Sequence, residues 1–380
     1  MSARDRRGGW WPWGLLALLA VLLSAPLWIL WSPGAHRWRD HAYRTLLYGQ
    51  VAQRVTQHCA TRQEVLDRLA EYVQTHLWTP GDAVPYDGTP ADNLIRGIGW
   101  CDYQAKTYAI LLATRDIPAR YAMLLEAGGN SPHTVAEVRQ GDRWGVYDVL
   151  FGVRFVDDQG RPLTLEALSA APGLLDRQPL VARLGRQWPD NVAGIHAAYD
   201  KVLPLAVPPR RSRPGTQSLS PFDRLLLFYA RIGGPRFVAW YQDQYLASEA
   251  WARAATPADR LRLARHWDLA GRTDAARTAY RRCIQDTTEI TLASEARVWL
   301  GLLEWEAGHP TAAARVFQEL TTQEPNSRWN PMAWYYMGRS AEALDQPAQA
   351  RTWYAQSADY MRAAWPRLIR LNAPPMPIAQ

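Results

Sequence analysis

The longest stretch without a charged residue that is also mostly apolar lies near the amino terminus. An uncharged and mostly apolar stretch runs from Trp10 to Trp31, behind a short tail that contains three arginines. As a helix this stretch would span about 33 Å, the thickness of one hydrocarbon core. Tryptophans stand at both of its ends, where interfacial aromatic residues are typical. We therefore predict that residues 1–31 form a transmembrane anchor.

A cleaved signal peptide is the alternative for this segment. Ser24 and Ala25 would suit a cleavage site, but Pro26 and further apolar sequence follow them, and the apolar run is longer than that of a usual signal peptide. The arginines on the two flanks nearly balance, and the very short leading tail favours an amino terminus inside the cell. In a bacterium this predicts a single-pass protein of the inner (cytoplasmic) membrane with its soluble body in the periplasm.

Beyond a linker at residues 32–60, the pattern has helical periodicity. Thr61 and Glu64 form a capping-box pattern, and apolar residues follow at helical spacing as far as Leu77. After a loop rich in proline and glycine, a second helix is predicted at residues 101–114. Its small residues would let this helix pack closely against a sheet.

Three further runs have the pattern of strands. They lie at residues 120–125, 133–138 and 144–149. The sequence Gln140-Gly141-Asp142-Arg143 predicts a hairpin between the second and the third strand. Together with the helices before them, these strands predict an α+β domain over residues 61–168.

Residues 169–255 are predicted as a linker and helical connector. The first part is rich in proline, glycine and arginine, most clearly from Pro208 to Gly215, where we expect a solvated loop. Residues 222–251 have a helical and aromatic pattern, which is broken at Gly233-Gly234-Pro235.

The carboxy-terminal third contains an internal repeat with a period of 37 residues. Small residues recur at two positions of the repeat, and an aromatic residue follows the second of them by four positions. The residues that carry the period are Ala264, Gly301 and Gly338; Ala276, Ala313 and Ala350; and Tyr280, Phe317 and Tyr354. This pattern predicts an all-α solenoid of helix-turn-helix pairs at residues 256–365, with turns at Gly271, Gly308 and Asp345.

The composition limits the classes of function. A hydrophobic fraction of 48% with 19 tryptophans indicates a folded protein. The net charge of +7 comes mainly from arginines that are scattered among acidic residues, so we predict no nucleic-acid binding. Three cysteines without CxxC spacing and eight dispersed histidines predict no disulfide framework and no metal site, and nothing in the sequence implies a cofactor.

One Cys, one His and one Asp stand at the edges of three neighbouring predicted elements. Cys101 lies in the first turn of its helix, where unpaired N–H groups favour a thiolate. The hairpin would bring His133, at the start of one strand, near Asp148, at the end of the next. We predict a catalytic triad in which Cys101 attacks, His133 transfers the proton and Asp148 orients the imidazole.

The intermediate of such a reaction carries an oxyanion that needs hydrogen-bond donors. The backbone N–H of Cys101 is one candidate because it lies at a helix start. Trp100, Tyr86 or another loop group is the candidate for a second donor, and the sequence does not decide between them.

These motifs together resemble the transglutaminase-like superfamily, which has a papain-like fold. The resemblance rests on Gly99 with Cys101 and Ala105, on the turn Ile117-Pro118-Ala119-Arg120, on His133 with Glu137, and on Trp144 to Asp148. It implies a Cys-His-Asp triad that works through a thioester acyl-enzyme, without calcium as in most small bacterial members. Departures occur at Trp100, Asp116 and Val135. They leave the acyl acceptor open, and resemblance to bacterial relatives favours a peptidase or amidase over a cross-linking enzyme.

The carboxy-terminal repeats resemble tetratricopeptide repeats (TPR). The resemblance implies a concave groove that takes a peptide or a helix of a partner. A plain packing role for the repeats is the alternative. Pro325 matches the repeat-ending proline of the family, whereas Thr288 and Arg362 do not.

Two functions of different classes follow. The first is a membrane-anchored, periplasm-facing cysteine enzyme that cleaves or transfers protein amide or peptide bonds, while the repeats dock a substrate or a protein partner. The second is a catalytically inactive anchored scaffold that binds peptides or proteins through the TPR groove. The reactivity of Cys101 separates the two, because the cysteine of a binding domain reacts like an ordinary thiol.

Overall fold

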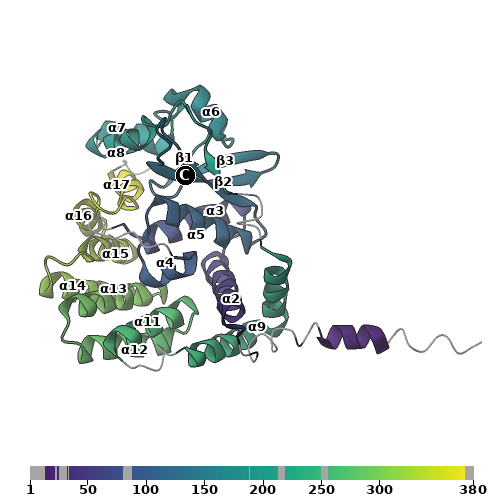
Figure 1. Cartoon of the computed structure of the whole chain (residues 1–380). Helices are drawn as coiled ribbons and strands as arrows, with labels where there is room; N and C mark the ends of the chain where they lie inside the picture. Colours follow the sequence, from purple (N-terminus) through teal and green to yellow (C-terminus); the bar gives the residue numbers. More distant parts are fainter. Residues whose placement is uncertain are drawn as a thin grey trace, which may run out of the picture. The chain divides into compact units, whose positions relative to one another are not determined.

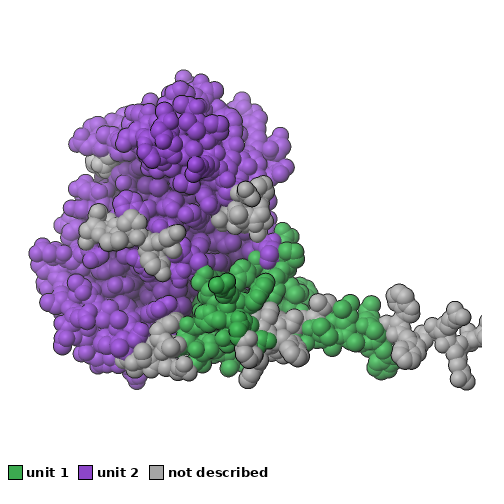
Figure 2. All heavy atoms as spheres, viewed as in Figure 1, with its two compact units in different colours: residues 1–46, 221–253 green, residues 47–220, 254–380 purple. Residues whose placement is uncertain are grey.

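The structure is a computed structural model of the 380-residue chain. It describes residues 13–21, 24, 32, 34–79, 88–187, 189–212, 219–249 and 256–372. The chain divides into two compact units, which Figure 2 distinguishes by colour. Unit 1 comprises residues 1–46 and 221–253, and unit 2 comprises residues 47–220 and 254–380. The predicted α+β domain and the predicted repeats therefore belong to one unit.

Unit 1 contains the first turns of α2 (His36–Thr56) and the long helix α9 (Pro221–Ser248). The carboxylate of Asp223 on α9 lies 2.7 Å from Nε2 of His41 on α2, and this contact ties the two helices together. The helical course of α9 is interrupted at Gly234, which has a φ of 63°. The predicted break in this helix is confirmed.

The amino-terminal anchor is only partly within the described residues. Residues 13–21 are helical, whereas residues 10–12, 22, 23 and 25–31 of the predicted span lie outside the description. None of the described helices has both the length and the apolar character needed to cross a membrane. The transmembrane anchor thus stays a prediction.

The α+β domain consists of a sheet with helices packed against it (Figure 1). Its helices are α3 (Arg62–His76), α4 (Pro90–Arg96) and α5 (Cys101–Ala113), and its strands are β1 (Ala119–Leu124), β2 (His133–Gln140), β3 (Arg143–Asp148), β4 (Val153–Arg154) and β5 (Arg210–Arg211). The described strands have the order β4-β3-β2-β1-β5, and all neighbours are antiparallel. Helix α5 packs against β1 and β2. The predicted mixed fold is confirmed.

Local sequence signals account for the start of α3 and for the hairpin. The Thr61 hydroxyl accepts a hydrogen bond from the backbone N–H of Glu64, and the Glu64 carboxylate accepts one from the backbone N–H of Thr61. This is the predicted capping box. In the hairpin between β2 and β3, Gln140 pairs with Arg143. Gly141 at its tip has a φ of 63°, a conformation that glycine adopts without strain.

The segment after β4 is more structured than its composition indicates. It forms α6 (Leu165–Ala170), the short 3-10 turn η1 (Pro172–Leu174), α7 (Pro179–Gln187) and α8 (Pro189–Tyr199). The piece around Pro208, predicted as a solvated loop, supplies strand β5, which pairs with β1. That prediction was wrong because the partner strand lies far earlier in the chain, and local composition carries no signal of such pairing.

Helix pairs form the carboxy-terminal solenoid of unit 2. They are α11 (Pro257–Leu269) with α12 (Thr273–Asp286), α13 (Ile290–Glu306) with α14 (Pro310–Gln323), and α15 (Asn330–Ala343) with α16 (Pro347–Ser357), and α17 (Ala364–Asn372) follows them. The small residues allow the predicted close packing. A Cβ on Gly301 would lie 2.6 Å from the ring of Phe317, and one on Gly338 would lie 2.7 Å from the ring of Tyr354.

The first helix of each pair contacts the α+β domain. Arg265 of α11 donates hydrogen bonds to the end of α4, at 2.7 Å to the carbonyl oxygen of Leu94 and at 3.1 Å to that of Ile95. Glu306 of α13 lies 2.7 Å from Nε2 of His76 on α3. The repeats therefore hold one face against the chain's own α+β domain.

Candidate active site

Cys101 is the first residue of α5 and is half-buried. The chain reaches it through Gly97, which ends α4 with a φ of 67°. The N–H of Gly99 then donates to the carbonyl oxygen of Trp78 at 3.1 Å. Trp100 is the N-cap residue of α5, and its side chain makes no capping hydrogen bond. The first amides of α5 are therefore left available beside the Cys101 thiol.

His133 and Asp148 form a buried pair. Nε2 of His133 lies 2.6 Å from Oδ2 of Asp148, and the two side chains are 1% and 0% exposed. His133 is the first residue of β2 and Asp148 is the last residue of β3, so the hairpin brings them to the same end of the sheet. Because Nε2 contacts the carboxylate, Nδ1 is the ring nitrogen left to exchange a proton with Cys101, which lies close enough to act on the pKa of His133. All three predicted residues are brought together.

Two further donors hold the carboxylate of Asp148. The hydroxyl of Tyr199 donates to Oδ2 at 2.7 Å, and the backbone N–H of Phe151 donates to Oδ1 at 3.1 Å. Burial and the charge of Asp148 raise the pKa of Tyr199, so its hydroxyl keeps the proton that it donates. These bonds fix the orientation of the carboxylate and, through it, the tautomer of His133.

The charges of the site favour a protonated imidazole. Burial acts to lower the pKa of His133, but the charge and hydrogen bond of Asp148 and those of Cys101 outweigh it, and the pKa rises to about 10. Burial acts to raise the pKa of Asp148, but His133, Tyr199 and the amide of Phe151 together lower it. The arrangement suits an imidazolium between a carboxylate and a thiolate, as in cysteine nucleophiles that are activated by histidine.

Aromatic rings surround the imidazole of His133. The ring centre of Phe151 lies 5.5 Å from that of His133, and the ring centre of Tyr199 lies 5.3 Å from it. Phe151 also stacks on Trp365 of α17, at 6.4 Å and with an angle of 15° between the rings. The segment that follows the last repeat therefore contributes to the wall of the site.

Comparison with known protein families gives two matches. The model of the transglutaminase-like superfamily matches residues 49–149, a range that contains Cys101, His133 and Asp148. The chain carries a transglutaminase-like domain. A model of the tetratricopeptide repeat matches residues 295–327, on the carboxy-terminal side of that domain, and both predicted resemblances are confirmed. No curated protein and no solved structure matches the chain.

The predicted oxyanion donors of the transglutaminase-like domain are placed differently. The backbone N–H of Cys101 lies at the start of α5, as predicted. Trp100 precedes it and is 38% exposed, and Tyr86 lies outside the described residues. No signal in the sequence indicated Trp78, whose buried indole N–H has no hydrogen-bond partner in the described part of the chain. Its backbone pairs with Gly97 and Gly99, in the turn before Cys101, so Trp78 supplies an unpaired donor on the segment next to this turn.

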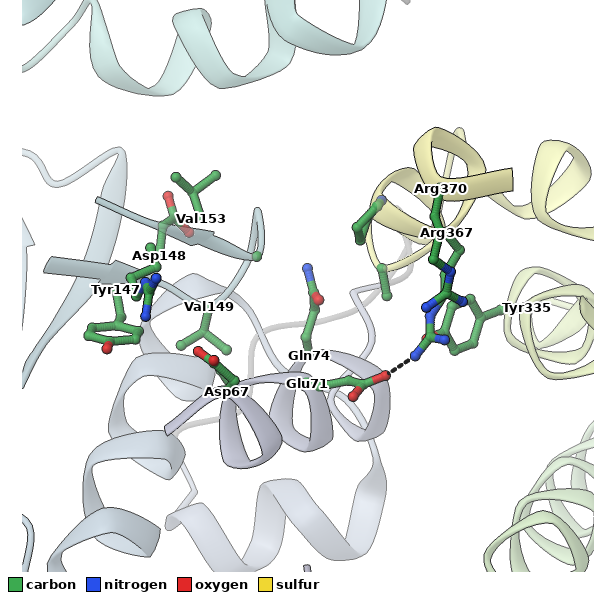
Figure 3. Close-up of a pocket in the computed structure, with 15 residues that line it drawn as sticks. Asp67, Glu71, Gln74, Tyr147, Asp148, Val149, Val153, Tyr335, Arg367 and Arg370 are labelled. Carbon is green, nitrogen blue, oxygen red and sulfur yellow. Dashed lines mark hydrogen bonds and ion pairs between the residues drawn. The ribbon is translucent and has the colours of Figure 1, made fainter. Parts of the chain in front are cut away.

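A cleft of about 340 Å³ lies between the transglutaminase-like domain and the end of the repeats. Helix α3, strands β3 and β4, and helices α15 and α17 contribute to its walls (Figure 3). Glu71 in this cleft accepts a hydrogen bond of 2.6 Å from Arg367, and Asp67 and Arg154 also line it. Asp148 belongs to the lining as well, but its side chain is 0% exposed, so the carboxylate is closed off from the cleft.

A second buried carboxylate of the transglutaminase-like domain is structural. Glu137 on β2 is fully buried and accepts hydrogen bonds from Arg120 at 2.9 Å and from Arg211 at 2.8 Å. These ion pairs tie β2 to β1 and β5. Within the described ranges, no three His, Cys, Asp or Glu side chains are grouped so that they could hold a metal ion.

Proposed function

We propose that this protein is a cysteine enzyme that cleaves or transfers protein amide or peptide bonds through a thioester on Cys101. The observation that carries the proposal is the buried contact of 2.6 Å between His133 and Asp148, with Cys101 close enough to the same imidazole to raise its pKa. Burial of ionisable groups costs free energy. Peptide binding alone does not require a buried His-Asp pair beside a cysteine, whereas activation of a cysteine nucleophile does.

The proposed reaction has two halves. In the first, the sulfur of Cys101 attacks the carbonyl carbon of the amide, the C–N bond breaks, and His133 donates its proton to the leaving nitrogen. In the second, water or an amine attacks the thioester, His133 accepts its proton, and the thiolate leaves. Asp148 stabilises the imidazolium at the start and at the end of this cycle.

We infer that water is the usual acceptor, so that the enzyme acts as a peptidase or an amidase. The support is the resemblance to bacterial relatives and the departure at Trp100, which stands where eukaryotic cross-linking enzymes carry Gln. Transfer to an amine uses the same acyl-enzyme and differs only in the second nucleophile.

Mass spectrometry of peptides tests the activity. A pool of glutamine-containing peptides is incubated with the protein and a labelled primary amine. Chain cleavage identifies a peptidase, exchange of ammonia for water identifies an amidase, and incorporation of the amine identifies a transferase. Each product must disappear in Cys101→Ala and in His133→Ala, and must persist in Cys59→Ala, which removes a cysteine outside the triad. Products that persist in Cys101→Ala would contradict the proposal.

We further propose that residues 1–31 anchor the protein in the inner membrane with its body in the periplasm. The support is the uncharged stretch from Trp10 to Trp31 and its flanking tryptophans. Fractionation of cells that express the full chain or a chain without residues 1–31 tests the anchor, and protease digestion of spheroplasts tests the orientation. Recovery of the full chain in the soluble fraction would contradict this proposal.

The repeats are proposed to dock a protein partner or a substrate on faces that the transglutaminase-like domain does not use. One such face has a cleft of about 200 Å³ between α12, α13 and α14, which Arg281, Leu300 and Glu319 help to line. The alternative function, an inactive scaffold, uses the same faces. It predicts that partner binding survives Cys101→Ala while no reaction product forms with the native chain.

A further inference from the structure

Arg362 is a cation of the carboxy-terminal segment that reaches the candidate active site. It lies between α16 and α17 and is half-buried. Its guanidinium carbon lies 4.9 Å from the ring centre of Phe151. The ring centre of Phe151 lies 5.5 Å from that of His133. Arg362 and the catalytic imidazole therefore contact the same aromatic ring.

The guanidinium of Arg362 has no carboxylate partner of its own within the described residues. The other arginines of this segment differ, because Arg367 is bound to Glu71 and Arg370 to Glu342. A guanidinium that is held away from water without a carboxylate costs free energy. That cost is offset when a ligand supplies the carboxylate, and the planar guanidinium binds such a group with two parallel hydrogen bonds.

Burial lowers the pKa of Arg362, and the acidic groups that act against this shift are Asp148 and Cys101 of the triad. Asp148 is already bound by His133, by Tyr199 and by a backbone amide, and among the described residues it forms no ion pair with the guanidinium. Arg362 thus brings positive charge close to the nucleophile while its hydrogen-bond donors remain free for another group.

The pocket next to Arg362 has free polar groups as well. Arg362 lines it together with Trp78, Gln104 and Leu150. The indole N–H of Trp78 and the side-chain oxygen of Gln104 are buried and have no partner in the described part of the chain. The pocket has a volume of about 20 Å³, which is the size of a single water molecule, so these groups add unpaired hydrogen-bonding capacity next to Arg362.

We propose that Arg362 binds a carboxylate of the substrate next to the amide that Cys101 attacks. The substrate class is then acidic, namely amides with an Asp or Glu side chain or a free carboxy terminus beside the reacting carbonyl. This inference rests on the proposed function and deepens it. It also assigns a role in specificity to a segment far beyond the family match, which ends at residue 149.

A pair of alkylating reagents tests this inference without a known substrate. Iodoacetate carries the carboxylate that Arg362 is proposed to bind, and iodoacetamide is its neutral counterpart. The rate of Cys101 alkylation by each reagent is measured by mass spectrometry on the full chain. The variants are Arg362→Gln, the charge-preserving Arg362→Lys, and Arg143→Gln as a matched control at the exposed far end of β3.

The expected result is a change in the ratio of the two rates. Arg362→Gln lowers the rate with iodoacetate about tenfold, the scale of a focused single charge, and leaves the rate with iodoacetamide within about twofold. Arg362→Lys retains most of the ratio, and Arg143→Gln leaves it unchanged. An unchanged ratio in Arg362→Gln would overturn the inference. An equal loss with both reagents would also overturn it, because Arg362 would then act on the thiolate alone.

Failure of the proposed function has a different signature. If His133→Ala leaves the iodoacetamide rate of Cys101 unchanged, the triad itself is not operating, whatever the ratio of the two reagents shows. The thermal unfolding midpoint of Arg362→Lys and Arg362→Gln shows whether each variant is folded, and a folded Arg362→Lys keeps the test decisive if Arg362→Gln unfolds.

Short peptides then identify the source of the carboxylate. Peptides with a glutamate side chain, with a free carboxy terminus, or with both groups amidated compete with iodoacetamide for Cys101. The form that protects Cys101 in the native chain and not in Arg362→Gln is the one that Arg362 binds. If neither anionic form protects better than the neutral one, the inference is contradicted.

Discussion

The indole ring of Trp299 occupies the space next to the α carbon of Gly97. A Cβ at Gly97 would lie 2.0 Å from this ring, far inside van der Waals contact. The guanidinium of Arg265 stacks on Trp299 at 3.7 Å and donates to the end of α4. The turn that leads to Cys101 is therefore held by side chains of the first and second repeats.

Gly97→Ala tests this fit. We expect a loss of about 3 kcal/mol or more in the free energy of unfolding, because both the left-handed backbone and the indole ring oppose a Cβ. Gly129→Ala is the matched control, since Gly129 also has a positive φ but no atom would meet its Cβ. The control is expected to lose about 1 kcal/mol. Equal losses in urea denaturation would contradict the role of Trp299.

Tyr199→Phe tests the support of Asp148. The substitution keeps the ring beside His133 and removes the hydroxyl that donates to Asp148 at 2.7 Å. We expect a loss of about 1–3 kcal/mol in unfolding free energy, the usual cost of a buried bond to a charged group. Turnover should fall severalfold with little change in KM, because the substrate does not touch this hydroxyl. Urea denaturation measures the free energy of unfolding, and steady-state kinetics measure kcat and KM. If the variant has the unfolding free energy and the kcat of the native chain, the Tyr199 hydroxyl does not support Asp148.

Asp148→Asn tests the charge of the site as a function of pH. The pKa of His133 is raised to about 10 chiefly by Asp148 acting against burial, so we expect it to fall in the variant. The stability that the protonated His133 contributes is full below its ordinary pKa of 6.5 and is lost as pH rises toward about 10. The pKa of Asp148 is lowered in the folded chain, so the stability that its carboxylate contributes is full above pH 3.8 and is lost in acid.

The difference in unfolding free energy between the native chain and Asp148→Asn should therefore be largest between about pH 4 and 6.5 and should shrink toward pH 10. Urea denaturation across this range measures it. A difference that does not depend on pH would show that the pair is not charged. The variant should also alkylate Cys101 more slowly near neutral pH, by roughly 10²-fold.

Glu71→Gln tests the junction between α3 and the repeats. Glu71 accepts hydrogen bonds from Arg339 at 2.8 Å and from Arg367 at 2.6 Å. We expect the free energy of unfolding to fall by about 2 kcal/mol. This is less than the cost of breaking a fully buried ion pair, because the Glu71 side chain is 31% exposed. Burial opposes the charge of Glu71, but the arginines lower its pKa below 4.5. The loss of unfolding free energy in Glu71→Gln is therefore full above pH 4.5 and disappears in acid.

Glu319→Gln is the control for this variant, since Glu319 is exposed on α14. Its effect on the free energy of unfolding should stay within about 0.5 kcal/mol. If Glu71→Gln behaves like this control at neutral pH, the ion pairs at the junction contribute nothing to stability.

Local patterns explain why much of the site could be predicted from the sequence. The capping box at Thr61, the hairpin tip at Gly141 and the helix start at Cys101 each depend on a few neighbouring residues. Once the hairpin is known, the strand ends that carry His133 and Asp148 must lie at the same end of the sheet. The 37-residue period fixed the packing of the repeats in the same way, because it records the contact of small and aromatic residues.

The residues that were missed act across long distances in the chain. Tyr199 and Arg211 lie in a stretch whose proline and glycine content indicated a linker, and their partners Asp148 and Glu137 belong to earlier strands. The helical spacing of Val192, Ile195 and Tyr199 was the one local signal of α8.

Arg362 carried no signal at all. At the sequence level it was only a mismatch to the repeat-ending proline, and its place near the triad depends on how the repeats pack on the core. Contacts of this kind follow from the tertiary structure alone.

If Cys101, His133 and Asp148 work as a unit, the rate of Cys101 alkylation by iodoacetamide must depend on pH through His133. Mass spectrometry follows Cys101 beside Cys59 and Cys283 in the native chain and in His133→Ala. We expect Cys101 to react fast near neutral pH, faster than the other two thiols, and to slow strongly in His133→Ala. If Cys101 reacts no faster than an ordinary thiol, and at the same rate in His133→Ala, the three residues do not form a catalytic triad.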